Sequence, residues 1–115
     1  YAMGSQIGVL AQKHPKTKFI LGHGGILHFW EEAIEVALQN PNVYIIMCGC
    51  HNWGMQRICN RLDPTRLLFG TDILNNTTGP MAAYRCEQFR RIQLDEQTRK
   101  LIASENALAL YKWDR

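Results

Sequence analysis

The sequence predicts an α/β fold in which parallel strands alternate with helices, and two observations predict it. Three short apolar runs lack polar alternation, as expected of strands covered on both faces of a parallel sheet. These runs are Phe19–Leu21, Val43–Met47 and Leu67–Phe69. The segments between them change to a helical period. Alternation of strands and helices along one chain is typical of the α/β class.

The three predicted strands share one local layout. Each follows a proline and a few turn residues and ends at a glycine: "HPKTKFILG", "NPNVYIIMCG" and "DPTRLLFG". Proline ends the preceding helix because it lacks an N–H and restricts the residue before it. A unit of a (β/α)₈ barrel averages about 31 residues, so three such units make less than half of a barrel. We therefore expect one partial barrel domain over residues 1–115; a complete three-stranded α/β sandwich is the alternative.

Five helices are expected from the apolar period and from terminal signals. Ser5 is a candidate N-cap of the first helix, and Asp95 opens the last one. Phe29 is expected on the apolar face of the second. The predicted ranges are Ser5–Lys13, Phe29–Gln39, Trp53–Leu62, Pro80–Ile92 and Asp95–Ser104.

Composition excludes several classes of protein. The chain is 46% hydrophobic and 20% charged, as is usual for a globular protein with a core. The formal charge of +3 is scattered along the chain, which predicts no nucleic-acid partner. Apolar runs fall short of the roughly 20 residues of a membrane span. The four cysteines lack the pattern of a disulfide framework, so we expect free thiols and a cytoplasmic location.

A residue whose side chain could bind a metal or transfer a proton follows each predicted strand. His23 comes after the first, His51 after the second and Asp72 after the third. The carboxyl ends of parallel strands meet at one edge, so these side chains are expected on one rim. Two histidines and an aspartate are residue types used for metal binding and general-base catalysis. In the alternative interpretation Asp72 is a turn residue and His23 a hydrogen-bonded loop residue.

Two motifs at this rim contain glycine. In "GHGG" (residues 22–25) the glycines permit positive φ and close backbone approach, and we expect them to let the His23 imidazole face an open pocket. The pattern matches neither common phosphate-binding loop, which argues against a nucleotide site. In "CGCHNWG" (residues 48–54) the potential zinc ligands are spaced too closely for a structural site. We interpret Cys48 as a core residue and Cys50 as a loop residue, with His51 and Trp53 lining a pocket.

Four segments in this order carry a family resemblance: "LAQKHPKTKFILGHGG", "NPNVYIIMCG", "LDPTRLLFGTDI" and "LIASENALALY". Together they resemble the amidohydrolase-related family, in particular its aminocarboxymuconate semialdehyde decarboxylase-like branch. The resemblance covers residues 5–111. It implies a distorted (β/α)₈ TIM barrel of which this chain supplies strands six to eight, the C-terminal portion. It also implies a divalent metal at the mouth of the barrel, zinc in most members, with manganese or iron as alternatives.

The resemblance assigns roles to two residues. Asp72 matches the aspartate after strand eight, which binds the metal or the activated water. His23 matches the histidine after strand six. That histidine activates or positions the metal-bound water in single-metal members and is itself a ligand in two-metal members. The His-x-His pair of strand one and the histidine of strand five have no counterpart at matching positions here.

The expected function is that of a metal-dependent hydrolase or decarboxylase acting on a small organic acid, lactone or amide. This chain would supply one wall of the active site and would be inactive alone. His28, Trp30, His51 and Trp53 are the expected substrate contacts. The alternative is a non-catalytic half-barrel. Because its outer strands would have open edges, we expect it to pair with the remaining barrel segment or with a second copy.

Overall fold

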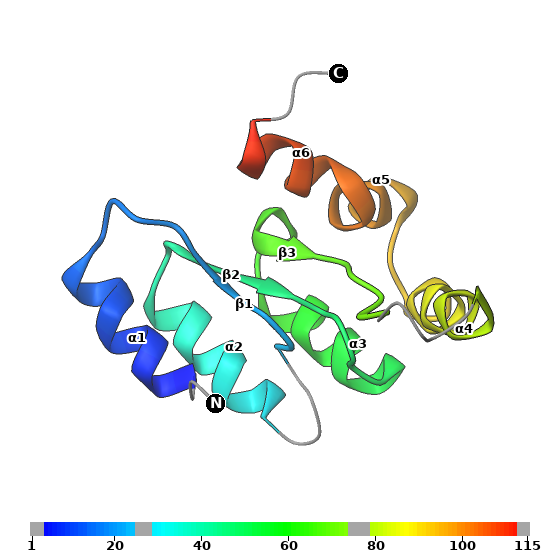
Figure 1. The fold of residues 1–115 in the computed structure, drawn as a ribbon, viewed down its shortest axis with the longest axis horizontal. Coiled ribbons are helices and arrows are strands. Elements are labelled where there is room, and N and C mark those ends of the chain that lie inside the picture. Colours follow the sequence, from blue (N-terminus) through cyan, green and yellow to red (C-terminus); the bar gives the residue numbers. More distant parts are fainter. Residues whose placement is uncertain (1–3, 25–28, 74–78, 113–115) are drawn as a thin grey trace.

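The computed structural model describes residues 4–24, 29–73 and 79–112. Their helices and strands follow one another in the order shown in Figure 1. The elements are α1 (Gly4–Lys13), β1 (Phe19–Leu21), α2 (Trp30–Gln39), β2 (Val43–Ile46), α3 (Asn52–Arg61), a 3₁₀ turn (Pro64–Arg66), β3 (Leu67–Leu68), α4 (Gly79–Arg90), α5 (Glu96–Lys100), a π-helical segment (Leu101–Glu105) and α6 (Asn106–Tyr111). Within these ranges no helix is both long and apolar enough to cross a membrane.

The three strands form one parallel sheet in the order β1-β2-β3. Phe19 pairs with Val43, and Ile45 pairs with Leu67. A helix follows each strand, and α1, α2 and α3 lie along the same side of the sheet in Figure 1. The predicted parallel α/β arrangement is therefore confirmed. The second and third strands end one residue earlier than predicted, at Ile46 and Leu68.

The core lies between the sheet and helices α2 and α3. Helix α2 buries Ala33, Ile34, Val36 and Ala37, and these side chains join strand and α3 residues such as Val43, Ile45 and Ile58 in one apolar cluster. Phe29 was predicted to share this face, but it is 57% exposed. It precedes the first turn of α2 with φ −83° and ψ 0°, so the helical period does not carry its side chain inward.

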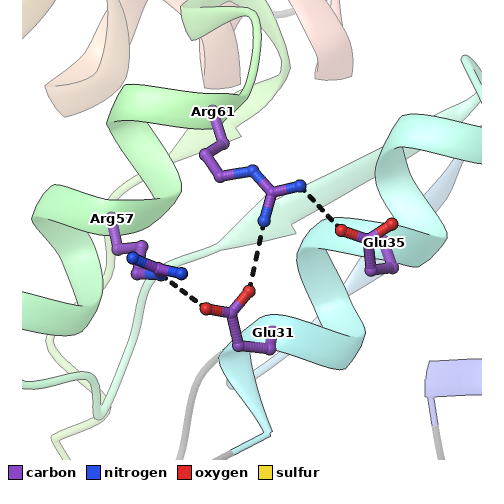
Figure 2. A network of polar contacts seen from close by, with 4 residues as sticks. All are labelled: Glu31, Glu35, Arg57 and Arg61. Atoms are coloured by element: carbon purple, nitrogen blue, oxygen red, sulfur yellow. Dashed lines mark hydrogen bonds and ion pairs between the residues drawn. The ribbon is translucent and has the colours of Figure 1, made fainter.

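Charged residues join the outer surfaces of α2 and α3 (Figure 2). Arg61 contacts Glu31 at 3.3 Å and Glu35 at 2.7 Å, and Arg57 also pairs with Glu31. Each pair is partly exposed and contributes at most about 1 kcal/mol. Because Glu31 and Arg61 are shared between pairs, the network restrains one helix relative to the other.

Two predictions about where helices begin and end were wrong, and one was confirmed. Ser5 lies inside α1, and its backbone N–H donates to Glu32 Oε1 at 2.9 Å, so the N-cap assignment was wrong. Asp95 caps α5 as expected, accepting from the Thr98 backbone N–H at 2.9 Å. The last helix was predicted to end at Ser104 but continues through the π-helical segment and α6 to Tyr111. No proline or glycine interrupts this segment, and its Ala and Leu residues favour helix.

The C-terminal helices cover the outer edge of β3. The backbone N–H of Phe69 donates to Ile102 O at 3.0 Å. The buried Asn106 amide donates to Leu67 O at 2.8 Å and to Pro64 O at 2.7 Å. The expectation of an open edge on the third strand was therefore wrong, because a helical segment supplies the partners that a neighbouring strand would supply.

Replacing Asn106 by Ala should weaken this edge. Leu67 O would lose the side-chain donor on its outer side and Pro64 O would keep only the Leu67 N–H, and we expect the free energy of unfolding to fall by about 2 kcal/mol. Urea denaturation measures the change. Asn60→Ala is the matched control, because Asn60 is exposed and should cost less than about 0.5 kcal/mol. Equal effects of the two substitutions would show that the Asn106 hydrogen bonds do not hold β3.

Candidate metal centre

Three potential metal ligands meet beyond the carboxyl ends of the strands. His23 follows β1, Cys48 follows β2 and Asp72 follows β3. One donor atom from each of the three lies within 4.8 Å of the other two. We call His23, Cys48 and Asp72 the strand-tip cluster. Parallel pairing explains the convergence, because it delivers the ends of all three strands to one edge.

Gly24 brings the first member of the cluster against the second. Its backbone N–H donates to Ile46 O at 3.1 Å, so the chain after β1 stays close to β2. A Cβ on Gly24 would overlap Cγ2 of the buried Ile45. The close backbone approach expected of the glycine motif therefore occurs at Gly24.

Positive φ angles occur at two of the three cluster residues. His23 has φ 54° and Asp72 has φ 55°. Neither Gly22 nor Gly24 has a positive φ, so that part of the expectation for the motif was wrong at these two glycines. The left-handed region costs a non-glycine residue about 1 kcal/mol or more, and such residues concentrate at functional sites. The two strained residues face one another across the end of β2.

One imidazole nitrogen faces both other members of the cluster. His23 Nδ1 lies 3.5 Å from Asp72 Oδ2 and 3.6 Å from Cys48 Sγ. The backbone N–H of His23 also donates to Cys48 Sγ at 3.4 Å. A Cys–His–Asp nucleophilic triad uses opposite nitrogens of the imidazole, one toward the nucleophile and one toward the carboxylate. The cluster does not have that arrangement.

The environments of the Cys48 and Cys50 thiols differ from those predicted. Cys48 is buried as expected, but its sulfur faces His23, so it belongs to the rim as much as to the core. Burial raises the pKa of the Cys48 thiol, and the charge of Asp72 adds to the rise. Cys50 was interpreted as a loop residue, yet it is 1% exposed and donates to Gly24 O at 3.5 Å. Burial raises the pKa of Cys50 to about 12, so it is an inert core thiol.

The predicted substrate contacts form an aromatic group at the start of α2 and α3. Trp30 and Trp53 pack edge to face with ring centroids 5.4 Å apart, and His51 stacks on Trp53 at 6.2 Å. Trp53 is 49% exposed, and Arg57 lies over the Trp30 ring. The Nε1 atom of Trp30 is buried and has no acceptor among the residues that the structure describes. His28 lies outside the described residues.

Comparison with known proteins identifies the family. The model of the amidohydrolase family matches residues 3–113, and the chain belongs to this family. The family predicted from the sequence is thereby confirmed. No curated protein matches the chain.

Two solved structures are similar to the chain. One is a dihydroxybenzoic acid decarboxylase from Polaromonas sp. JS666 with bound manganese and the inhibitor 2-nitroresorcinol. Its TM-score is 0.65 at 22% identity, over 100% of this chain and 42% of that one. The other is a 2,6-dihydroxybenzoate decarboxylase complexed with 2,6-dihydroxybenzoate, with a TM-score of 0.66 at 18% identity, over 97% and 42%. The chain thus spans about two fifths of the length of both, and the likeness shows a shared fold that matches part of a TIM barrel.

Because of the close contact at Gly24, we expect alanine to destabilise the protein at Gly24 but not at Gly22. In Gly24→Ala the new Cβ would displace Ile45 or the backbone, and we expect a loss of about 2 kcal/mol of unfolding free energy. In Gly22→Ala the Cβ meets nothing within 4 Å, and stability should be unchanged or slightly higher. Urea unfolding of both variants checks the difference. Equal stabilities would mean that the approach of Gly24 to β2 is not a packing constraint.

Proposed function

We propose that this chain forms one wall of the active site of a metal-dependent decarboxylase or hydrolase acting on a small organic acid. The observation that carries the proposal is the convergence of His23 and Asp72, with Nδ1 and Oδ2 3.5 Å apart, beyond the ends of parallel strands in an amidohydrolase family member. We also propose that β1, β2 and β3 are strands six, seven and eight of the barrel.

The donor atoms of the cluster suit a divalent ion. Carboxylate oxygen and imidazole nitrogen are ligands of zinc, manganese and iron alike. When bound, such an ion polarises carbonyl and carboxylate oxygens and lowers the pKa of a coordinated water toward about 7. Asp72 would hold the ion through its carboxylate. His23, half-exposed beside it, would either move a proton to or from the reacting group or serve as a further ligand.

The substrate class is proposed from the site and from the relatives. The names of both solved relatives point to dihydroxybenzoates, which are small aromatic acids. Here the exposed Trp53 ring and the stacked His51 offer aromatic surface, and the buried Nε1–H of Trp30 beside them has no acceptor among the residues that the structure describes. Such groups suit a planar, oxygenated acid better than an aliphatic amide or lactone. We therefore propose a hydroxylated aromatic acid as substrate and decarboxylation as the reaction.

The non-catalytic alternative has less support. The pairing expected of it needed open edges at both outer strands, and the outer edge of β3 is occupied by Ile102 and Asn106. A partner on the edge of β1, supplied by the remaining barrel segment, is compatible with the enzymatic proposal.

Metal analysis of the full-length protein tests the function. We expect about one divalent ion per chain, and Asp72→Asn should weaken its binding at least tenfold, because a neutral amide replaces the anionic ligand. Asp95→Asn is the matched control, because Asp95 is a helix cap and asparagine caps equally well. Turnover of 2,6-dihydroxybenzoate should fall with the metal content. Absence of metal from the wild type, or equal metal in both variants, would contradict the proposal.

A further inference from the structure

We propose that Cys48 is a third ligand of the ion, so that the strand-tip cluster forms a site for a thiophilic divalent cation, zinc rather than manganese. The inference rests on the proposed function, because it concerns the ion at the same strand ends. It changes the role of Cys48 from a core residue to the residue that selects the metal.

Two of the three separations within the cluster are those of donors around one ion. Zinc binds imidazole nitrogen and carboxylate oxygen at about 2.0–2.2 Å and thiolate sulfur at about 2.3 Å. In a tetrahedral site these bond lengths place the donors about 3.3–3.6 Å apart. Nδ1 of His23 lies 3.5 Å from Asp72 Oδ2 and 3.6 Å from Cys48 Sγ. Cys48 Sγ and the Asp72 oxygen lie within 4.8 Å of one another, so these two side chains would close on a bound ion.

The polar contacts of His23 also favour an ion. Nδ1 carries at most one proton, which it can direct well toward only one of its two neighbours. A cation in place of that proton would bind Nδ1, the carboxylate and the sulfur together. The His23 backbone N–H already points at Cys48 Sγ, and hydrogen bonds of this kind orient and stabilise a thiolate ligand.

The backbone holds the sulfur in position. Cys48 is 8% exposed, and a Cβ on Gly70 would lie 3.3 Å from the Cβ of Cys48, so the segment that follows β3 packs directly against it. Thiolate ligands favour zinc, and sites built from carboxylate and water suit manganese. This chain should therefore prefer zinc, unlike the similar decarboxylase structure that holds manganese.

Cobalt(II) substitution of the full-length protein tests the thiolate directly. Thiolate bound to cobalt gives a sulfur-to-metal charge-transfer band in the near ultraviolet. We expect this band in the wild type and in Cys50→Ser, a neighbouring buried thiol that faces Gly24 O. We expect its loss in Cys48→Ser. The dissociation constant for zinc should rise at least tenfold in Cys48→Ser, and that for manganese less than about threefold.

A second measurement needs no variant. X-ray absorption spectroscopy of the zinc-loaded wild type should show one sulfur neighbour of the ion at about 2.3 Å. Absence of that sulfur neighbour, or a charge-transfer band that survives in Cys48→Ser, would overturn the inference. If Asp72→Asn still releases the metal in that case, the proposed function stands without the thiolate. If neither zinc nor cobalt binds, both proposals fail.

Discussion

The contact between Gly24 and β2 is the constraint on which the candidate site depends. Because Gly24 has no Cβ, its N–H reaches Ile46 O and the chain turns tightly after β1. His23 is thereby held in the left-handed region with Nδ1 toward Cys48 and Asp72. The strain at His23 is offset by the packing of the core beneath it, which Ile45 anchors at 0% exposure.

Asp72 depends on a second, more distant support. It follows β3, which has only two residues and pairs with β2 on one side. On the other side the C-terminal helices take the place of a strand, through Ile102 and the amide of Asn106. The carboxylate at the rim is thus positioned by residues 30 and 34 positions later in the chain. A site assembled in this way is sensitive to changes far from any chemistry.

Much of the fold could be predicted because its signals are local. The strand Phe19–Leu21, the parallel order and the Asp95 cap follow from apolar runs, prolines and cap chemistry. Errors arose where a neighbour in space decided the outcome. Phe29 fits a helical period but lies before the first turn, and Ser5 is drawn into α1, where its N–H meets Glu32. The extension of the last helix to Tyr111 agrees with its Ala and Leu residues, and packing against β3 adds to that local preference.

For the candidate site, the sequence by itself determined that His23 and Asp72 follow parallel strands, and that the chain belongs with the amidohydrolases. Strand order suffices to bring both residues to one rim, and the family follows from the resemblance of four sequence segments. Only the tertiary structure decided that Cys48 faces the same point and that Cys50 does not. The physical reason is that one or two residues at the end of a strand, together with the φ angles there, decide which side chain faces the rim.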